Sequence, residues 1–152
     1  HAAAALAEFR KKGLPVFHVR HVSVRPGATF FIPGTKGAEI HAGVLPAASE
    51  AAVEKNFPNS FRGTDLKQRL DAAGVKHLVV AGMMTQMCVD STTRAAADLG
   101  FKCVLAHDAC ATRALSFGGA SVTAENVQTA FLAALNGLFA RIQPTAEICA
   151  AL

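Results

Sequence analysis

The segment from Leu78 to Asp90 constrains the fold more than any other part of the chain. Its first four residues are fully apolar, like a strand buried in a parallel sheet, and Gly82 interrupts this strand before a helix that carries Cys88. We expect Thr85 to cap that helix, which would place Cys88 in its first turn. Unpaired N–H groups and the helix dipole favour a thiolate there, so the sequence predicts a nucleophilic cysteine.

Predicted strands and helices alternate along the rest of the chain. Hydrophobic periodicity and stop residues predict helices over residues 2–12, 65–73 (capped by Thr64), 88–99 and 124–139 (capped by Thr123), and a final turn or two after residue 143. Strands are predicted over residues 15–21, 51–54, 78–81, 103–106 and 140–143. This alternation indicates one α/β domain, residues 1–152, with right-handed crossovers and a three-layer parallel sheet.

Composition narrows the classes of partner. The net charge of +4 is scattered without a basic run, and no apolar run approaches the roughly 20 residues of a membrane span, so we expect neither nucleic-acid nor membrane binding. Four cysteines lack disulfide or zinc spacing, which favours reduced thiols and a cytoplasmic location. We expect core positions for Cys103 and Cys149 and a loop position for Cys110. Apolar helices and an alanine-rich surface favour a homo-oligomer of undetermined stoichiometry.

Three segments are predicted to meet at the carboxyl ends of the strands, where sites of α/β folds gather. They are Lys55, the turn before Cys88, and His107 with Asp108. For each, a structural role is the alternative: a surface lysine, a buried thiol, and an aspartate that caps a turn. Phe61 either lines a pocket or fixes its loop to the core, and the loop of residues 23–37 either closes over a substrate or covers a subunit boundary.

Four motifs together resemble the isochorismatase-like cysteine hydrolases, which include nicotinamidases and N-carbamoylsarcosine amidohydrolase. The motifs are Lys55 to Phe61, Gly63 to Leu66, Gly82 to Val89, and His107 to Thr112. The resemblance implies a doubly wound, mostly parallel sheet with helices on both faces and an Asp-Lys-Cys triad, in which Lys55 and Cys88 match. It also implies a cis peptide at Met83-Met84, an oxyanion hole formed by the Met84 and Cys88 amides, and substrate contacts at Phe61 and Thr85.

Two positions depart from the family pattern. In the family, the triad aspartate lies at the end of a first strand that would precede Ala2. We therefore expect that the sequence omits an N-terminal segment. Without that strand, we expect the sheet to be left as two halves with unpaired edges. Nicotinamidases hold a metal with an Asp-x-His pair where this chain has Val19-Arg20-His21. We therefore expect no catalytic metal and no cofactor, and leave His18, His21 and His41 as loop or pocket residues.

The resulting hypothesis is a cysteine hydrolase that cleaves a carbon–nitrogen bond of a small amide, carbamoyl or ureido substrate through a thioester. The alternative is a non-catalytic oligomeric binding or scaffold protein of the same fold.

Overall fold

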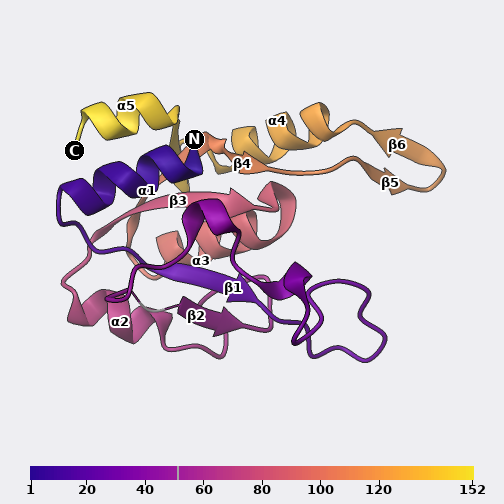
Figure 1. The fold of residues 1–152 in the computed structure, drawn as a ribbon. Coiled ribbons are helices and arrows are strands. Elements are labelled where there is room, and N and C mark those ends of the chain that lie inside the picture. Colours follow the sequence, from indigo (N-terminus) through magenta and orange to yellow (C-terminus); the bar gives the residue numbers. More distant parts are fainter. Residues whose placement is uncertain (51) are drawn as a thin grey trace.

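The fold is described from a computed structural model, which covers residues 1–50 and 52–152. Figure 1 shows three layers: parallel strands in the middle, with helices on both faces. The helices are α1 (Ala2–Lys11), α2 (Leu66–Ala72), α3 (Asp90–Asp98), α4 (Ala124–Leu135) and α5 (Thr145–Ala150). The predicted α/β class with a doubly wound, mostly parallel sheet is confirmed.

The parallel strands form two separate groups. One pairs β1 (His18–His21) with β2 (Ala52–Lys55), and the other has the order β3 (His77–Met83), β4 (Lys102–Ala111), β7 (Ala140–Gln143). β1 and β3 face each other (Figure 1) but are not hydrogen-bonded neighbours. A cavity of about 610 Å³ lies between them and runs along β3 from His77 to Met83. The observed sheet therefore consists of two halves with unpaired inner edges, as the sequence analysis expected.

The core is built from side chains of β2, β4 and β7 together with those of α2, α3 and α4. Leu105 of β4 and Leu135 of α4 are completely buried, and Leu70 of α2 is 2% exposed. Ala96 on α3 is also completely buried, and its small side chain lets the helix approach the sheet closely. On the opposite face, α1 and α5 lie against each other. This core fixes β3 and α3, the two elements that flank Cys88.

Several predicted boundaries are corrected by the structure. β1 begins at His18, because residues 13–17 form a turn and an extended connection after α1. The second strand was predicted over residues 51–54; residue 51 lies outside the described residues, and β2 extends to Lys55. α4 ends at Leu135, where Gly137 adopts a φ of +87° before β7. Thr123 caps α4 by accepting a hydrogen bond from Asn126 N, as predicted.

The region after residue 106 differs most from its prediction. β4 continues to Ala111, so His107, Asp108 and Cys110 lie in a strand, and the loop position expected for Cys110 is wrong. A register shift between Val80 and Gly82 accommodates the longer β4. An antiparallel hairpin follows, formed by β5 (Leu115–Phe117) and β6 (Ala120–Val122), which the sequence analysis did not predict. Figure 1 shows this hairpin projecting beyond the body of the molecule.

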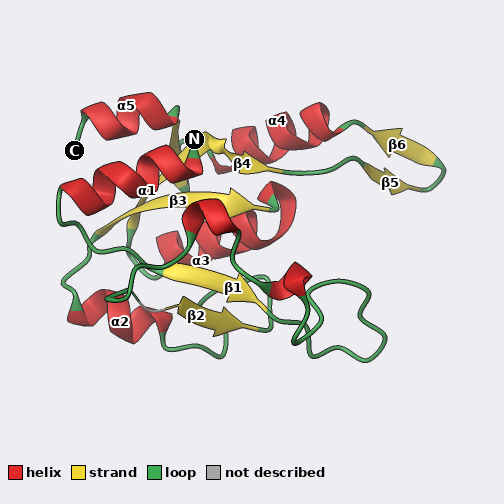
Figure 2. Ribbon diagram, viewed as in Figure 1, coloured by secondary structure: helices red, strands yellow, loops and turns green. Residues whose placement is uncertain are grey.

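The connection from β1 to β2 is the longest irregular segment (Figure 2). It contains two short 3₁₀ turns, Lys36–Ala38 and Ala42–Val44. The predicted loop of residues 23–37 is its first half. None of the helices in the described part of the chain combines the length and the apolarity needed to cross a bilayer.

Candidate active site

Lys55 lies at the carboxyl end of β2, and its side chain is directed inward. The parallel register pairs His21 of β1 with Lys55, and Val22 N donates a hydrogen bond to the Lys55 carbonyl over 2.9 Å. Asn56 Nδ2 then binds the Val22 carbonyl at 2.8 Å. These bonds tie the ends of β1 and β2 together. Lys55 is consequently only 4% exposed, which excludes the surface position that was its structural alternative.

The Lys55 ammonium donates to three acceptors. They are Cys88 Sγ at 3.1 Å, His21 Nδ1 at 3.0 Å and the Phe57 carbonyl at 3.0 Å. An ammonium has three N–H donors and no acceptor, so each donor has one partner here. His21 Nδ1 must then be unprotonated. In agreement, the pKa of His21 is lowered from 6.5, first because the ring is partly buried and second because of the charge on Lys55.

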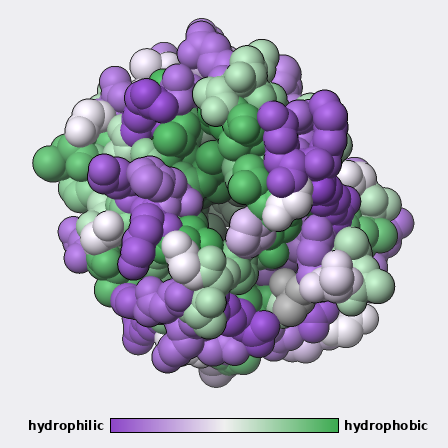
Figure 3. Space-filling model, turned by 90° about the vertical axis from the view of Figure 1, so that its left-hand side faces the viewer, coloured by the Kyte–Doolittle hydropathy of each residue, from purple (hydrophilic) through white to green (hydrophobic). Residues whose placement is uncertain are grey.

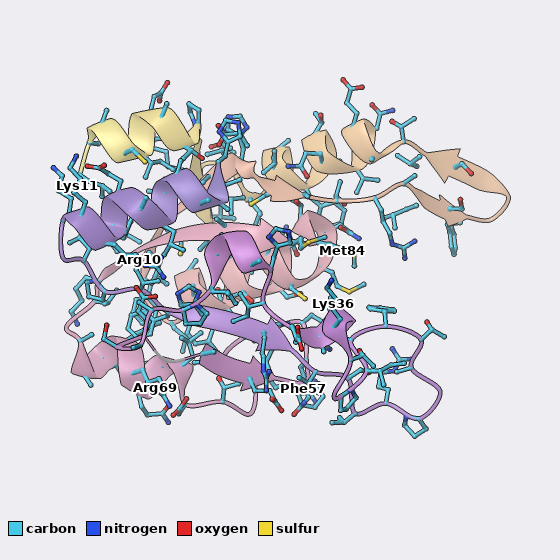
Figure 4. The ribbon with its side chains drawn as sticks, viewed as in Figure 1. Arg10, Lys11, Lys36, Phe57, Arg69 and Met84 are labelled. Atoms are coloured by element: carbon cyan, nitrogen blue, oxygen red, sulfur yellow. The ribbon has the colours of Figure 1, made fainter. Side chains whose placement is uncertain are left out.

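Cys88 lies on a single turn of π-helix, Thr85–Val89, which connects β3 to α3. The Met84 carbonyl accepts from Met87 N at 3.0 Å and from Val89 N at 3.2 Å, and these bonds close the turn around Cys88. The Met83–Met84 peptide bond preceding it is cis. Figure 4 shows Met84 just beyond the end of β3. Cys88 therefore occupies a wide helical turn at the carboxyl edge of the sheet.

The structure assigns Thr85 a different role from the predicted one. The residue before the turn is Met84, and the Thr85 side chain does not cap the helix. Thr85 is completely buried, and its hydroxyl oxygen finds no hydrogen-bond partner among the described residues. The cap predicted at Thr85 is therefore wrong, whereas the substrate contact predicted for it stays a prediction.

The loop after Lys55 is held against α3 by hydroxyl groups. Ser60 is 5% exposed, and its N–H and Oγ bind Thr92 Oγ1 at 3.1 and 2.9 Å. Thr64 Oγ1 in turn donates to the Ser60 carbonyl at 2.6 Å. This arrangement fixes the loop that carries the Phe57 carbonyl relative to the helix that follows Cys88, and so fixes the distance between Lys55 and Cys88.

Phe61 combines both of its predicted roles. Its ring stacks on Phe101 with the centroids 6.1 Å apart, so it belongs to the packing around the core. It also lines the cavity between β1 and β3, together with Lys55 and Cys88. Figure 3 shows a hollow bordered by hydrophobic side chains on the face opposite the carboxyl ends of the strands. The cavity follows the unpaired edge of β3, so its volume reflects the gap between the two halves of the sheet.

The other titratable residues of this edge have structural roles. Asp108 accepts hydrogen bonds from Thr145 N at 2.8 Å and Thr145 Oγ1 at 2.6 Å, which ties β4 to the start of α5. Burial acts to raise the pKa of Asp108, but the bonds from Thr145 outweigh it and the pKa is lowered. Burial raises the pKa of the Cys110 thiol to about 11, so this neighbour of Gly82 in β4 is a poor nucleophile.

Sequence reasoning missed the contact of His21 with Lys55 and the Ser60–Thr92 pair. Neither could be found from motif spacing, because each depends on the register of two segments more than 30 residues apart. Among residues 1–50 and 52–152, no three His, Cys, Asp or Glu side chains are grouped as a metal site would require. His18 instead binds Glu50 at 2.8 Å, and His41 Nδ1 accepts from Gly43 N at 3.1 Å.

Known proteins of similar sequence and structure include both uncharacterized proteins and named hydrolases. The chain is 48% identical over 144 residues to YddQ, an uncharacterized isochorismatase family protein of Bacillus subtilis, covering 95% of this chain and 80% of that protein. A crystal structure of an isochorismatase hydrolase from Oleispira antarctica matches with a TM-score of 0.93 at 51% identity, covering 97% of this chain and 78% of that one.

The relatives that are named as enzymes have lower sequence identity to this chain, and the chain covers a smaller share of their length. The streptothricin hydrolase of Streptomyces noursei is 43% identical over 107 residues, which is 70% of this chain but 38% of that enzyme. Nicotinamidase 3 of Arabidopsis thaliana is 31% identical over 115 residues, which is 68% of this chain and 58% of that enzyme. A ureidoacrylate amidohydrolase of Variovorax paradoxus is 32% identical over 137 residues, which is 84% of this chain and 53% of that enzyme.

The family model of the isochorismatase domain matches residues 1–147, almost the whole chain. The sequence and the fold thus agree, and the chain belongs to the isochorismatase family.

Proposed function

We propose that the chain is a cysteine hydrolase that cleaves a carbon–nitrogen bond in a small amide, carbamoyl or ureido substrate. One observation carries the proposal: the buried ammonium of Lys55 donates to Cys88 Sγ over 3.1 Å. A cation at this distance stabilises a thiolate, which is the reactive form of a cysteine nucleophile. The relatives named as a nicotinamidase and as amidohydrolases support the bond type, because those names describe cleavage of amide bonds.

In the proposed reaction the Cys88 thiolate attacks the substrate carbonyl carbon, and a carbon–sulfur bond forms. The negative charge moves to the carbonyl oxygen, which the Met84 and Cys88 N–H groups would hold. Collapse of this intermediate breaks the carbon–nitrogen bond, releases the amine and leaves a thioester on Cys88. A water molecule then attacks the thioester, the acid leaves, and the thiolate is restored for the next cycle.

Two proton transfers accompany these steps. The amine gains a proton as it leaves, and the attacking water loses one. The family resemblance assigns both transfers to an aspartate, for which residues 1–152 offer no match at the expected position. Lys55 would hold the thiolate in place throughout. The neutral His21 accepts a hydrogen bond from Lys55 and so keeps the ammonium directed between its ring and Cys88.

The substrate would meet Cys88 beside Phe61, since both residues line the cavity between β1 and β3. Within the described residues, Lys55 is the charged side chain that contacts Cys88 Sγ. We propose a cytoplasmic location, since the four cysteines are free thiols and unpaired cysteines are typical of a reducing compartment.

Site-resolved alkylation and an amide panel test the proposal together. Iodoacetamide at neutral pH should modify Cys88 stoichiometrically, and Cys88→Ala should abolish turnover of any amide that the chain hydrolyses. Cys149→Ala is the matched control, because Cys149 is also partly buried but lies on α5, away from Lys55. An unreactive Cys88 and no turnover across a broad panel of amides would instead support a non-catalytic binding or scaffold protein.

A further inference from the structure

The long loop that follows β1 contains a strained residue. Phe31 has a φ of +56°, and among the described residues it is the one non-glycine residue with a positive φ. A bulky side chain is rare in this region of backbone space, and such a conformation persists only where the surrounding contacts enforce it. Residues strained in this way gather at functional sites. The contacts of Phe31 therefore indicate which part of the molecule the loop serves.

Backbone hydrogen bonds fasten Phe31 to the carboxyl ends of β1 and β2. Ser23 N donates to the Phe31 carbonyl over 2.8 Å, which closes residues 23–31 into a loop. The preceding residue, Val22, donates to the Lys55 carbonyl over 2.9 Å. Figure 1 shows this loop extending from the carboxyl end of β1. The same short stretch of backbone therefore holds both Lys55 and Phe31.

The half-buried ring of Phe31 packs on His21, the residue that accepts a hydrogen bond from Lys55. The two ring centroids are 5.2 Å apart and the ring planes are tilted by 47°, a geometry that aromatic pairs favour. Phe30 packs edge-on against Phe31, with the centroids 5.1 Å apart, and is itself 57% exposed. His21 is thereby held at two points: Lys55 binds its Nδ1, and Phe31 covers its ring.

The surroundings of His21 favour its neutral form. Lys55 is the charged side chain that contacts it among the described residues. Arg20 and Glu54 are the neighbours of His21 and Lys55 in the two strands; they pair with each other at 2.8 Å, and the alternation of side chains places them on the other face. Partial burial, to which the Phe31 ring contributes, lowers the pKa of His21. A protonated ring would carry donors at both nitrogens and would repel the ammonium.

We infer that Phe31 is a positioning residue of the candidate site, whose ring keeps His21 in place and thereby keeps Lys55 directed at Cys88. The inference rests on the proposed function in taking Lys55 and Cys88 as the reacting pair. Without the Phe31 ring, His21 turns away more readily, Lys55 loses one of its three acceptors, and the ammonium lies against the sulfur for less of the time. The strained loop thus belongs to the site.

Phe31→Gly removes the ring and relieves the strain, because glycine adopts a positive φ readily. We expect this variant to stay folded by far-UV circular dichroism and thermal unfolding, but its Cys88 should react with iodoacetamide at pH 7 about two- to tenfold more slowly. Phe31→Asn is a second variant, since asparagine tolerates this backbone region. Phe31→Tyr keeps the ring and should react as fast as the wild type. Phe30→Ala is the matched control, because Phe30 packs on Phe31 rather than on His21.

An NMR titration of the His21 ring gives a readout that does not depend on the chemistry of Cys88. The loss of its resonance in His21→Gln identifies it. In Phe31→Gly the ring should titrate at a higher pH than in the wild type, closer to 6.5, because it is less buried. An unchanged titration of His21 would overturn the inference. So would alkylation of Cys88 that is as fast in Phe31→Gly as in the wild type, or as slow in Phe30→Ala as in Phe31→Gly. A wild-type Cys88 that is never acylated would instead overturn the proposed function, and the His21 titration would still test Phe31.

Discussion

Replacing Lys55 by methionine removes the positive charge beside Cys88 and keeps an apolar side chain of similar length. At 3.1 Å and an effective dielectric constant of about 20, an ammonium and a thiolate attract each other by roughly 5 kcal/mol. Desolvation of the buried Lys55 offsets part of this attraction, and water at the partly exposed sulfur screens more. A net stabilisation of the thiolate of about 1.4–2.8 kcal/mol remains, which is a factor of about ten to a hundred.

The rate of Cys88 alkylation by iodoacetamide at pH 7 measures this factor, because the thiolate is the reacting form. We expect Lys55→Met to slow Cys88 modification about ten- to hundredfold, with the site of modification located by peptide mass spectrometry. Lys55→Arg keeps the positive charge, so it should slow the alkylation of Cys88 less than Lys55→Met does. Lys67→Met is the surface control, since Lys67 pairs with Asp71 on α2 and lies outside the candidate site. Equal rates for Lys55→Met and the wild type would refute the electrostatic argument.

Three further outcomes are expected. The pKa of His21 is lowered from 6.5 in the folded chain, so the unfolded chain binds more protons as the pH falls below about 6.5, and the free energy of unfolding should decline there. His21→Gln should flatten this decline in unfolding experiments between pH 8 and 5.5. Equal slopes of unfolding free energy against pH for the variant and the wild type would contradict the neutral ring. Leu105→Ala should lower the free energy of unfolding in urea by about 2–5 kcal/mol, because Leu105 is fully buried. Leu138 is exposed, so Leu138→Ala should change the free energy of unfolding by less than about 0.5 kcal/mol. Gly82→Ala should cost about 1–3 kcal/mol in the same assay, since Gly82 has a φ of +135°, and an unchanged midpoint would contradict this.

The sequence predicted the elements whose signals are local. The apolar run of β3, the glycine stops and the Thr123 cap each act within a few residues, and those elements are present in the structure. The grouping of Lys55 and Cys88 at one sheet edge also followed from the alternation of strands and helices, since parallel strands place their carboxyl ends together.

What the sequence did not reveal depends on contacts between distant segments. Thr85 was predicted as a cap from its residue type, but the junction is a π-helical turn that buries its side chain instead. The continuation of β4 through His107 and Asp108 depends on pairing with β3 across a register shift, and on the bonds from Thr145 of α5. Similarly, His21 reaches Lys55 through the β1–β2 register, which no spacing within either strand encodes.

The central claim is that Cys88 becomes acylated during turnover. Brief exposure of the chain to an activated acyl compound such as p-nitrophenyl acetate, followed by acid quench and peptide mass mapping, tests it most directly. We expect one acetyl group on Cys88, a slower appearance of the adduct in Lys55→Met, and no adduct on Cys103 or Cys110, whose pKa values are raised by burial. An unmodified Cys88, or acetylation distributed over the other cysteines at equal rates, would contradict the account.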